Sequence, residues 1–286
     1  MGRGQTAGLS EDAAVLSRVM DSLREAVIRA AIEWLELPRN SRGLDIACGI
    51  GLEDIRLVQS IAPHGRVVGL DLSMPSLIAA KGHSKECAQA GDLDFLLGDW
   101  SKLPFAGDSF DWIWSCDAVG YAPYYQAHAI EEITRIVRPG GSVAILFWSS
   151  QSLLPGYPGL EARLNASQAG IAPFEEGMPP ESHAMRGVGL LRSAGLERVR
   201  AMTFVHTAHS PLGDQALAAL TALFKMRWGG SEVELDEAYR DAYQRLCLPD
   251  SPDFILDQQD YCAFFTYTMF TGRKPNKSFH SVFTNQ

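Results

Sequence analysis

The chain has 286 residues, enough for one large domain or for one domain with a substantial insertion. Its hydrophobic fraction of 46% and charged fraction of 21% are ordinary for a globular protein, and no apolar run approaches the roughly 20 residues that span a bilayer. A net charge of −9 argues against nucleic-acid binding, which needs a basic surface. We therefore expect neither a nucleic-acid partner nor an integral membrane segment.

The cysteines indicate a reducing compartment. Their number is odd, and no two are spaced as C-x-x-C, so neither a disulfide framework nor a zinc site is predicted. We expect no bound metal and a cytoplasmic location. The five positions are Cys48, Cys87, Cys116, Cys247 and Cys262.

Residues 1–40 are predicted to form an N-terminal helical segment. Residues 1–10 are rich in glycine and polar side chains, whereas 10–37 carry apolar residues at helical spacing on one face. Such a helix packs on the sheet or folds over a bound ligand. Residues 38–41, Pro-Arg-Asn-Ser, then end the helix.

The stretch 43–54 reads as a buried strand, a glycine turn and the first turn of a helix. Leu44 and Ile46 are strand-like, and Gly49 and Gly51 lack a Cβ, so a ligand can approach the backbone there. After the second glycine the apolar spacing becomes helical. Strand, G-x-G turn and helix together indicate a nucleotide-type binding site at the carboxyl end of a parallel sheet.

Two acids make a dinucleotide an unsuitable ligand for this turn. Asp54 stands where a dinucleotide site has its third small residue, and Glu53 with Asp54 would repel a diphosphate at the helix N-terminus. A cationic cofactor without phosphate suits the site better, and S-adenosylmethionine, with its sulfonium and ammonium groups, is such a molecule. Alternatively, the two acids only complement the helix dipole.

The segment Leu-Asp-Ile-Ala-Cys-Gly-Ile-Gly at 44–51 resembles the first motif of the class I S-adenosylmethionine-dependent methyltransferases. That motif usually runs hydrophobic-Asp-x-Gly-x-Gly-x-Gly, and this chain departs from it with Ala47 at the first glycine position. The resemblance implies S-adenosyl-L-methionine as cofactor and S-adenosyl-L-homocysteine as product. It also implies cofactor contacts from Asp45, Ala47, Cys48, Gly49 and Gly51.

The second strand, 66–71, ends in Asp71, which lies 20 positions beyond the second glycine of the turn. A carboxylate at this place accepts hydrogen bonds from both ribose hydroxyls of a nucleoside ligand. Leu72 and Ser73 would line the cofactor next to it. Alternatively, Asp71 caps the helix that we predict over 75–90.

A short strand over 93–97 is followed by Asp99 and Trp100. In the resembling family, an acid and a bulky neighbour after strand three hold the adenine. The acid accepts a hydrogen bond from the adenine amino group, and the bulky side chain packs on the base. Alternatively, Trp100 is a core residue beneath the loop that contains Pro104.

Residues 104–115, Pro-Phe-Ala-Gly-Asp-Ser-Phe-Asp-Trp-Ile-Trp-Ser, resemble the P-F-x-D-x-S-F-D loop and fourth strand of small-molecule methyltransferases. We expect the strand over 110–115. Cys116 then opens the carboxyl end, which faces the transferred methyl group because ligands of such sheets lie outside the strand ends.

A helix predicted over 126–137 leads to Arg-Pro-Gly-Gly at 138–141, which resembles the turn before strand five, and to a strand over 142–148. Four signatures thus follow in the family's order. They imply an α/β fold, a doubly wound, mostly parallel seven-stranded sheet of the Rossmann-like methyltransferase type. The pattern is most similar to the menaquinone/ubiquinone-type group.

The second half of the chain is less regular. Strands over 197–206 and 261–272, the latter antiparallel, would complete the sheet. Helical pieces are expected over 160–169 and 184–194. About 50 residues, 209–258, intervene between the last two strands and have helical apolar spacing.

We predict that 209–258 and 149–183 together cap a substrate pocket. The acids of the insertion either steer a cationic substrate or form a solvated helix face. The predicted domains are the N-terminal segment 1–40, a methyltransferase domain over 41–208 and 259–273, the helical cap insertion 209–258 and a loose tail over 274–286.

Methyl transfer is an in-line displacement at a carbon that the sulfonium activates, so the reaction itself dictates no side chain. The catalytic residues stay unknown, with Tyr121, Tyr124 and His183 as candidates. The leading hypothesis is methyl transfer from S-adenosylmethionine to a small-molecule acceptor. The alternatives are an NAD(P)-dependent oxidoreductase and a non-catalytic S-adenosylmethionine-binding protein. The acceptor, the methylated atom and the oligomeric state stay open.

Overall fold

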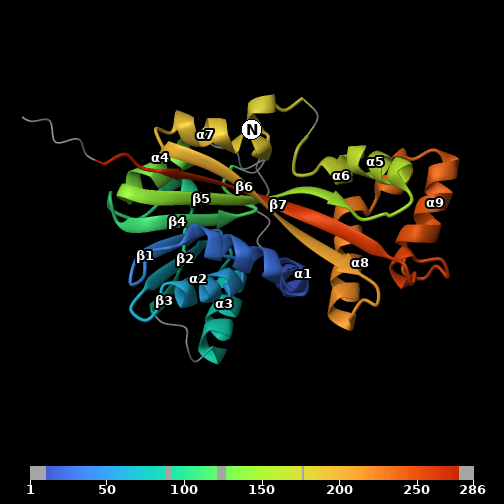
Figure 1. Cartoon of the computed structure of the whole chain (residues 1–286), viewed down its shortest axis with the longest axis horizontal. Helices are drawn as coiled ribbons and strands as arrows, with labels where there is room; N and C mark the ends of the chain where they lie inside the picture. Colours follow the sequence, from blue (N-terminus) through green and yellow to red (C-terminus); the bar gives the residue numbers. More distant parts are fainter. Residues whose placement is uncertain (1–10, 88–91, 121–126, 176, 277–286) are drawn as a thin grey trace, which may run out of the picture.

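The computed structural model describes residues 11–87, 92–120, 127–175 and 177–276. Within these residues, seven strands form one sheet in the order β3-β2-β1-β4-β5-β7-β6 (Figure 1). Strand β7 is antiparallel to both of its neighbours, and the other adjacent pairs are parallel. The strands are β1 (Arg42–Ile46), β2 (Arg66–Asp71), β3 (Asp92–Leu97), β4 (Phe110–Cys116), β5 (Val137–Ser152), β6 (Glu197–His209) and β7 (Cys262–Arg273).

The sheet confirms the predicted doubly wound, mostly parallel Rossmann-like architecture with an antiparallel seventh strand. None of the helices among the described residues is long and apolar enough to cross a membrane. The helices are α1 (Glu11–Leu35), α2 (Leu52–Ser60), α3 (Met74–Glu86), α4 (Ala127–Ile136), α5 (Pro158–Ala166), α6 (Gln168–Ile171), α7 (Gly187–Ser193), α8 (Asp214–Trp228) and α9 (Glu237–Cys247). Short 3₁₀ turns are η1 (Trp100–Lys102), η2 (Pro180–Ser182), η3 (Ala184–Arg186), η4 (Ser231–Glu234) and η5 (Ile255–Asp257).

Helices cover both faces of the sheet, with α1, α2 and α3 on one side and α4 and α7 on the other (Figure 1). A parallel strand buried on both faces needs apolar residues in succession rather than in alternation. Strand β1 follows this rule, because every residue after Arg42 is buried. Residues 112–114 of β4 are accordingly all apolar. In β1, Leu44 and Ile46 are apolar, and the residue between them is the buried acid Asp45.

Strand β5 is longer than the predicted 142–148. The Arg-Pro-Gly-Gly segment, predicted as a turn, lies inside the strand as a bulge: Phe110 pairs with Val137, but Trp112 pairs with Ser142. Gly140 supplies the left-handed conformation there, with φ of 77°. At its other end, β5 continues to Ser152 because it pairs with β7 beyond the end of β4.

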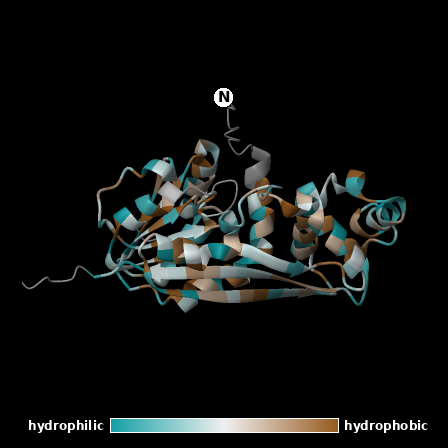
Figure 2. Cartoon of the chain, turned by 90° about the horizontal axis from the view of Figure 1, so that it is seen from above, coloured by the Kyte–Doolittle hydropathy of each residue, from teal (hydrophilic) through white to brown (hydrophobic). Residues whose placement is uncertain are grey.

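The extensions of β5, β6 and β7 support a lobe formed by α5, α6, α8 and α9 (Figure 1). Figure 2 shows these strands reaching from the helices of the sheet to those of the lobe. Helix α1 packs on α8 as well as on α2, so it joins the lobe to the sheet. Helices α8 and α9 lie between β6 and β7 in the chain.

One apolar residue of the insertion does not lie on a buried helix face. Val233 is an apolar residue within the predicted helical insertion 209–258, yet it is 79% exposed. The helix α9 begins only after Asp236, whose carboxylate accepts the N–H of Tyr239 as an N-cap. Val233 belongs to the preceding turn η4 and therefore does not share the helix face.

Candidate functional site

The loop after β1 is bound to the end of β2. The N–H groups of Ala47 and Cys48 donate to Leu70 O over 2.8 and 3.1 Å, and the N–H of Gly49 donates to Asp71 Oδ2 over 2.9 Å. Gly51, with φ of 76°, precedes the first residue of α2. The carboxyl ends of β1, β2 and β4, together with the loops that follow them, are referred to below as the carboxyl edge.

Asp71 is a buried hydrogen-bond acceptor at the carboxyl edge. Its Oδ1 accepts the N–H of Ser73 over 2.8 Å, and the Ser73 hydroxyl in turn caps α3 by accepting the N–H of Ser76. Each carboxylate oxygen has a second lone pair. Asp71 therefore organises the turn and keeps acceptor capacity for a ligand, whereas the alternative prediction that Asp71 caps the helix is wrong, because Ser73 is the N-cap of α3. Leu72 beside it is 59% exposed.

Asp45 and Asp54 form a buried pair of acids behind this loop, with exposures of 2% and 0%. Apart from each other's carboxyl group, the described residues offer no hydrogen bond to Asp45 Oδ2 or to the two carboxyl oxygens of Asp54. Burial raises the pKa of both carboxyl groups well above the usual value, and negative neighbours raise it further. The free protein therefore favours a protonated pair.

A cation from α1 lies in front of the carboxyl edge. Arg24 Nη2 is 3.8 Å from Glu53, and its Nη1 is 3.6 Å from Asp117. The Nε of Arg24 is buried and has no hydrogen-bond partner among the described residues. Glu53 also accepts the indole N–H of Trp114 over 2.9 Å. The sequence analysis did not predict Arg24 as a site residue. A basic residue beside Leu23, on the apolar face of α1, is the pattern that would have indicated it.

Asp117 connects the carboxyl edge to strands β5 and β7. Its Oδ1 accepts the backbone N–H of Trp148, and its Oδ2 accepts the hydroxyl of Tyr267, each over 2.9 Å. Burial raises the pKa of Asp117, and Arg24 opposes that rise. Cys116, the last residue of β4, is partly buried beside it. A residue that follows β4 is thus bound to residues within β5 and β7.

The remaining sequence candidates are more scattered. Asp99 is exposed and caps η1, because its Oδ1 accepts the N–H of Ser101 over 2.8 Å. Trp100 is partly buried against the core cluster beneath α4. Tyr121 and Tyr124 lie outside the described residues. The described residues contain no group of three His, Cys, Asp or Glu side chains placed to hold a metal ion.

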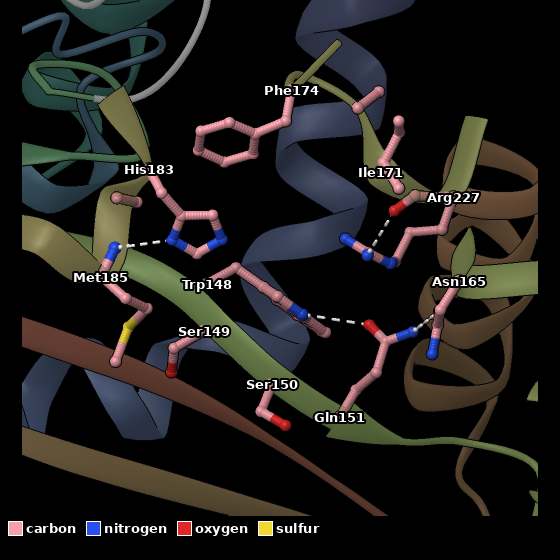
Figure 3. A pocket seen from close by; sticks show the side chains of 13 residues that line it. Trp148, Ser149, Ser150, Gln151, Asn165, Ile171, Phe174, His183, Met185 and Arg227 are labelled. Atoms are coloured by element: carbon pink, nitrogen blue, oxygen red, sulfur yellow. Dashed lines mark hydrogen bonds between the residues drawn. The ribbon is translucent and has the colours of Figure 1, made fainter. Parts of the chain in front are cut away.

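A cavity of about 430 Å³ lies between the end of β5 and the lobe (Figure 3). Its walls come from β5, α5, α6, α8 and the chain segment before α7, so 149–183 and 209–258 both contribute to it. The side chains that matter below are Trp148, Gln151, Asn165, Phe174, His183 and Arg227.

A chain of hydrogen bonds fixes the floor of this cavity. The indole N–H of Trp148 donates to Gln151 Oε1, and Gln151 Nε2 donates to Asn165 Oδ1, each over 3.0 Å. The indole ring of Trp148 stacks on the ring of Phe265, with ring centroids 4.6 Å apart. Because the backbone of Trp148 is bound to Asp117, the cavity begins directly beside the carboxyl edge.

Comparison with known proteins finds similarity to methyltransferases over the first strands of the sheet. Residues 44–145 match the family model described as a methyltransferase domain. The chain is 32% identical over 120 residues to demethylmenaquinone methyltransferase of Bacillus cereus, covering 42% of this chain and 50% of that protein. It is 35% identical over 122 residues to 2-phytyl-1,4-naphtoquinone methyltransferase of Thermosynechococcus vestitus, covering 42% and 51%.

The fold is similar to that of a solved enzyme. Phosphoethanolamine N-methyltransferase 2 of Haemonchus contortus, in complex with S-adenosyl-L-methionine, has a TM-score of 0.53 and 14% identity, over 95% of this chain and 59% of that one. At this identity the likeness concerns the fold alone. Residues 44–145 are thus similar to a methyltransferase domain, in a chain whose fold is similar to that of a solved methyltransferase. The chain spans about half the length of the curated relatives it matches.

Proposed function

We propose that the protein transfers a methyl group from S-adenosyl-L-methionine to a small molecule bound in the cavity under the lobe. The observation that carries this proposal is a buried cation and a buried acid with unused hydrogen-bonding capacity at the carboxyl edge. Among the described residues, Arg24 Nε is buried without a hydrogen bond, and Asp45 Oδ2 has no donor other than the carboxyl group of Asp54. A buried donor of a cation and a buried acceptor of an acid match the carboxylate and ammonium of an amino-acid ligand.

The charge of the carboxyl edge also fits this cofactor better than a dinucleotide. Asp45, Glu53, Asp54 and Asp71 are all at least nine-tenths buried there. A diphosphate would meet these acids at the N-terminus of α2, whereas a sulfonium and an ammonium neutralise them. The same argument disfavours the NAD(P)-dependent oxidoreductase.

We assign the cofactor contacts as follows. The Asp71 carboxylate accepts hydrogen bonds from the ribose hydroxyls while it continues to hold Gly49 and Ser73. Asp99 and Trp100 receive the adenine at the end of β3, and Cys116 borders the sulfonium at the end of β4. Arg24 binds the carboxylate of the amino-acid end.

The bound cofactor supplies a methyl group that the sulfonium makes electrophilic. The residues of the chain then have to align the acceptor and keep water away. Trp148 performs both tasks in our proposal, because its backbone is fixed by Asp117 and its ring forms the cavity floor. The segments 149–183 and 209–258 act as the cap.

The acceptor is a small molecule in this proposal. The cavity of about 430 Å³ is of the size of small-molecule sites. The names of the two curated relatives specify ring-containing quinone precursors, which supports an acceptor of this kind. The cytoplasmic location stays a prediction.

Thermal unfolding with added ligand tests the cofactor half of the proposal. S-adenosylhomocysteine and S-adenosylmethionine should each raise the midpoint, because a ligand at 100 times its Kd stabilises the folded state by about 2.7 kcal/mol. NADH should have no effect, and a rise with NADH alone would favour the oxidoreductase. Asp71→Ala should remove most of the shift, whereas Asp94→Ala, a change of an exposed acid on β3, should leave it intact.

Labelled methyl groups test the transfer itself. The protein with methyl-labelled S-adenosylmethionine should label at least one member of a panel of small-molecule acceptors. Binding of both adenosyl ligands without transfer to any acceptor would favour the non-catalytic binding protein.

A further inference from the structure

We propose that a proton occupies the buried Asp45–Asp54 pair in the free protein and that the positive charge of the cofactor displaces it. Asp54 is then a positioning residue, because it sets the charge of Asp45 and does not itself bind the cofactor. This inference rests on the methyl-transfer function proposed above. It concerns how the cofactor site selects a cationic amino-acid ligand over an uncharged nucleoside.

The geometry of the pair requires a proton. Asp45 lies in β1 and Asp54 in the first turn of α2, and both side chains are buried. The two carboxyl groups are hydrogen-bonded to each other. A carboxylate has no hydrogen to donate, so this bond needs a proton on at least one of the two groups.

Cations near the pair are bound to other acids. The arginines of α1 and α2, Arg24 and Arg56, form their ion pairs with Asp21, Glu25, Glu53 and Asp117. Among the described residues, no cation forms an ion pair with Asp45 or Asp54. A carboxylate that is buried without a cation is costly, and burial raises the pKa of both groups well above the usual value.

The other titratable groups around the pair do not supply the missing positive charge. Glu53 on α2 and Asp71 at the end of β2 are acids, and each raises the pKa of both carboxyl groups further. Burial raises the pKa of the Cys48 and Cys116 thiols, which keeps both neutral. His83 on α3 donates through Nδ1 to a backbone carbonyl of the glycine turn over 2.9 Å and forms no bond to either acid.

Strands β3 and β4 add aromatic rings to this environment. Trp114 stands beside Asp45 in the register of β1 and β4. Phe95 of β3 and Asp54 both approach Gly69, where an added Cβ would lie 2.8 and 2.6 Å from their nearest atoms. The surroundings of the pair are therefore apolar or acidic, and they favour its protonated state.

The cofactor reverses this preference. S-adenosylmethionine has an ammonium and a sulfonium, and S-adenosylhomocysteine keeps the ammonium. A positive charge near a carboxyl group favours its ionised form, so the pair gives a proton to the solvent when the ligand binds at the carboxyl edge. The charge of the ligand then replaces the charge of the proton.

This exchange makes binding depend on pH. The free protein holds more protons than the complex, so the affinity for the ligand rises with pH. The rise extends from the lower pKa of the pair in the complex to its raised pKa in the free protein.

A nucleoside without the amino-acid end is the matched ligand. 5′-Methylthioadenosine keeps the adenosine and the sulfur of the cofactor but has neither the ammonium nor the carboxylate. It should bind without proton release, and its affinity should be the same at pH 6 and pH 8.

Isothermal titration calorimetry of the full chain counts the protons. Each titration at pH 6 and pH 8 is repeated in two buffers of different ionisation enthalpy, and the difference between the observed enthalpies gives the number of protons released. S-adenosylhomocysteine should release a proton at pH 6. It should bind more tightly at pH 8 than at pH 6, by up to about tenfold for each pH unit.

Asp54→Asn and Asp94→Asn form a matched pair of variants. Asparagine is neutral and can donate an N–H to Asp45, so Asp45 no longer needs the proton. Asp54→Asn should release fewer protons at pH 6 and bind S-adenosylhomocysteine more tightly there than the wild type does, whereas a purely structural defect would weaken binding. Asp94 is exposed on β3, and its replacement should change neither the proton count nor the affinity.

Glu53→Gln tests the source of the proton. If Asp54→Asn releases as many protons as the wild type and Glu53→Gln releases none, the proton comes from Glu53 and its assignment to the pair is wrong.

The outcomes distinguish this inference from the proposed function. If S-adenosylhomocysteine binds without proton release, the displacement of a proton is wrong and the function stands. If 5′-methylthioadenosine releases as many protons as S-adenosylhomocysteine, the ammonium is not the cause and the inference is also wrong. If S-adenosylhomocysteine does not bind, the proposed function fails first, and this inference fails with it.

Discussion

The carboxyl group of Asp54 fits against β2 only because Gly69 has no side chain. A Cβ on Gly69 would lie 2.6 Å from Asp54 Oδ1 and 2.9 Å from the sulfur of Cys48. The loop after β1, the first turn of α2 and the middle of β2 are therefore packed as one unit around a buried acid. The sequence shows the acid and the glycine separately, 15 positions apart, and gives no sign that they touch.

Gly69→Ala should destabilise the protein by about 1–3 kcal/mol, because overpacking a tight core forces its neighbours to move. Urea unfolding measures the change. Gly82→Ala is the matched control, since a Cβ at this position in α3 meets no atom within 4 Å. The control should be neutral or stabilising by up to about 1 kcal/mol, as alanine is the better helix former. Equal effects of the two changes would contradict the packing described for Asp54.

Asp54→Asn should stabilise the free protein at pH 8 by on the order of 1–3 kcal/mol, because asparagine is neutral without taking up a proton, whereas each unit by which folding raises the pKa of Asp54 costs about 1.4 kcal/mol. Burial raises the pKa of Asp54 in the folded state. The folded protein thus holds a proton that the unfolded chain loses near pH 3.9, and stability falls as the pH rises through the interval between the two values. The gain from Asp54→Asn should therefore vanish near pH 4.

Thermal unfolding of the two proteins between pH 4 and pH 8 makes this comparison. Asp94→Asn removes an exposed acid and should leave the pH profile of the wild type unchanged. Parallel profiles for the wild type and Asp54→Asn would show that Asp54 is ionised without cost.

Ala47→Gly should stabilise the protein. Ala47 has φ of 62°, a left-handed conformation that costs a residue with a Cβ about 1–2 kcal/mol. Glycine adopts it freely, although it has more conformational entropy to lose on folding, so a net gain of about 0.5–1 kcal/mol is expected. Ala30→Gly in the middle of α1 should instead cost about 1 kcal/mol. The midpoints of urea unfolding should thus move in opposite directions.

Arg24→Gln should leave the buried carboxylate of Glu53 and the partly buried carboxylate of Asp117 without their cation. Burial already raises the pKa of Glu53 and of Asp117, and Arg24 is the largest opposing influence on both. Without Arg24 these pKa values rise further, so stability is lost as the pH increases above about 4. We expect a loss of about 1–3 kcal/mol at pH 8, because the arginine side chain is 20% exposed and the interaction is partly screened.

Arg18→Gln provides the control, since Arg18 is exposed on the same helix. In Arg24→Gln the thermal shift caused by S-adenosylhomocysteine should also shrink, because Arg24 is assigned to the carboxylate of the ligand. A full shift in Arg24→Gln would remove that assignment while leaving the stability argument in place.

Local patterns predicted the elements that carry the cofactor half. The strands at 42–46 and 66–71 and the glycine turn between β1 and α2 follow from apolar runs and from residues that permit positive φ. The apolar run over 67–70 likewise predicted that Asp71 ends a strand. These predictions succeeded because each depends on neighbours within a few residues along the chain.

Long-range features escaped the sequence. Arg24, Glu53 and Asp117 come from three separate elements, and only the packing of α1 against the sheet brings them together. The extension of β5 beyond 148 depends on pairing with β7, more than 100 residues later.

The sequence by itself determined the class of sheet, the glycine turn at 49–51 and the acid that ends β2, since short-range backbone preferences and burial on both faces decide them. Only the tertiary structure decided which charges face one another and where the cavity lies. Trp148, His183 and Arg227 are far apart in the chain, and their distances depend on how the lobe folds back onto β5. Contacts of this kind come from packing between distant segments, and no local pattern encodes them.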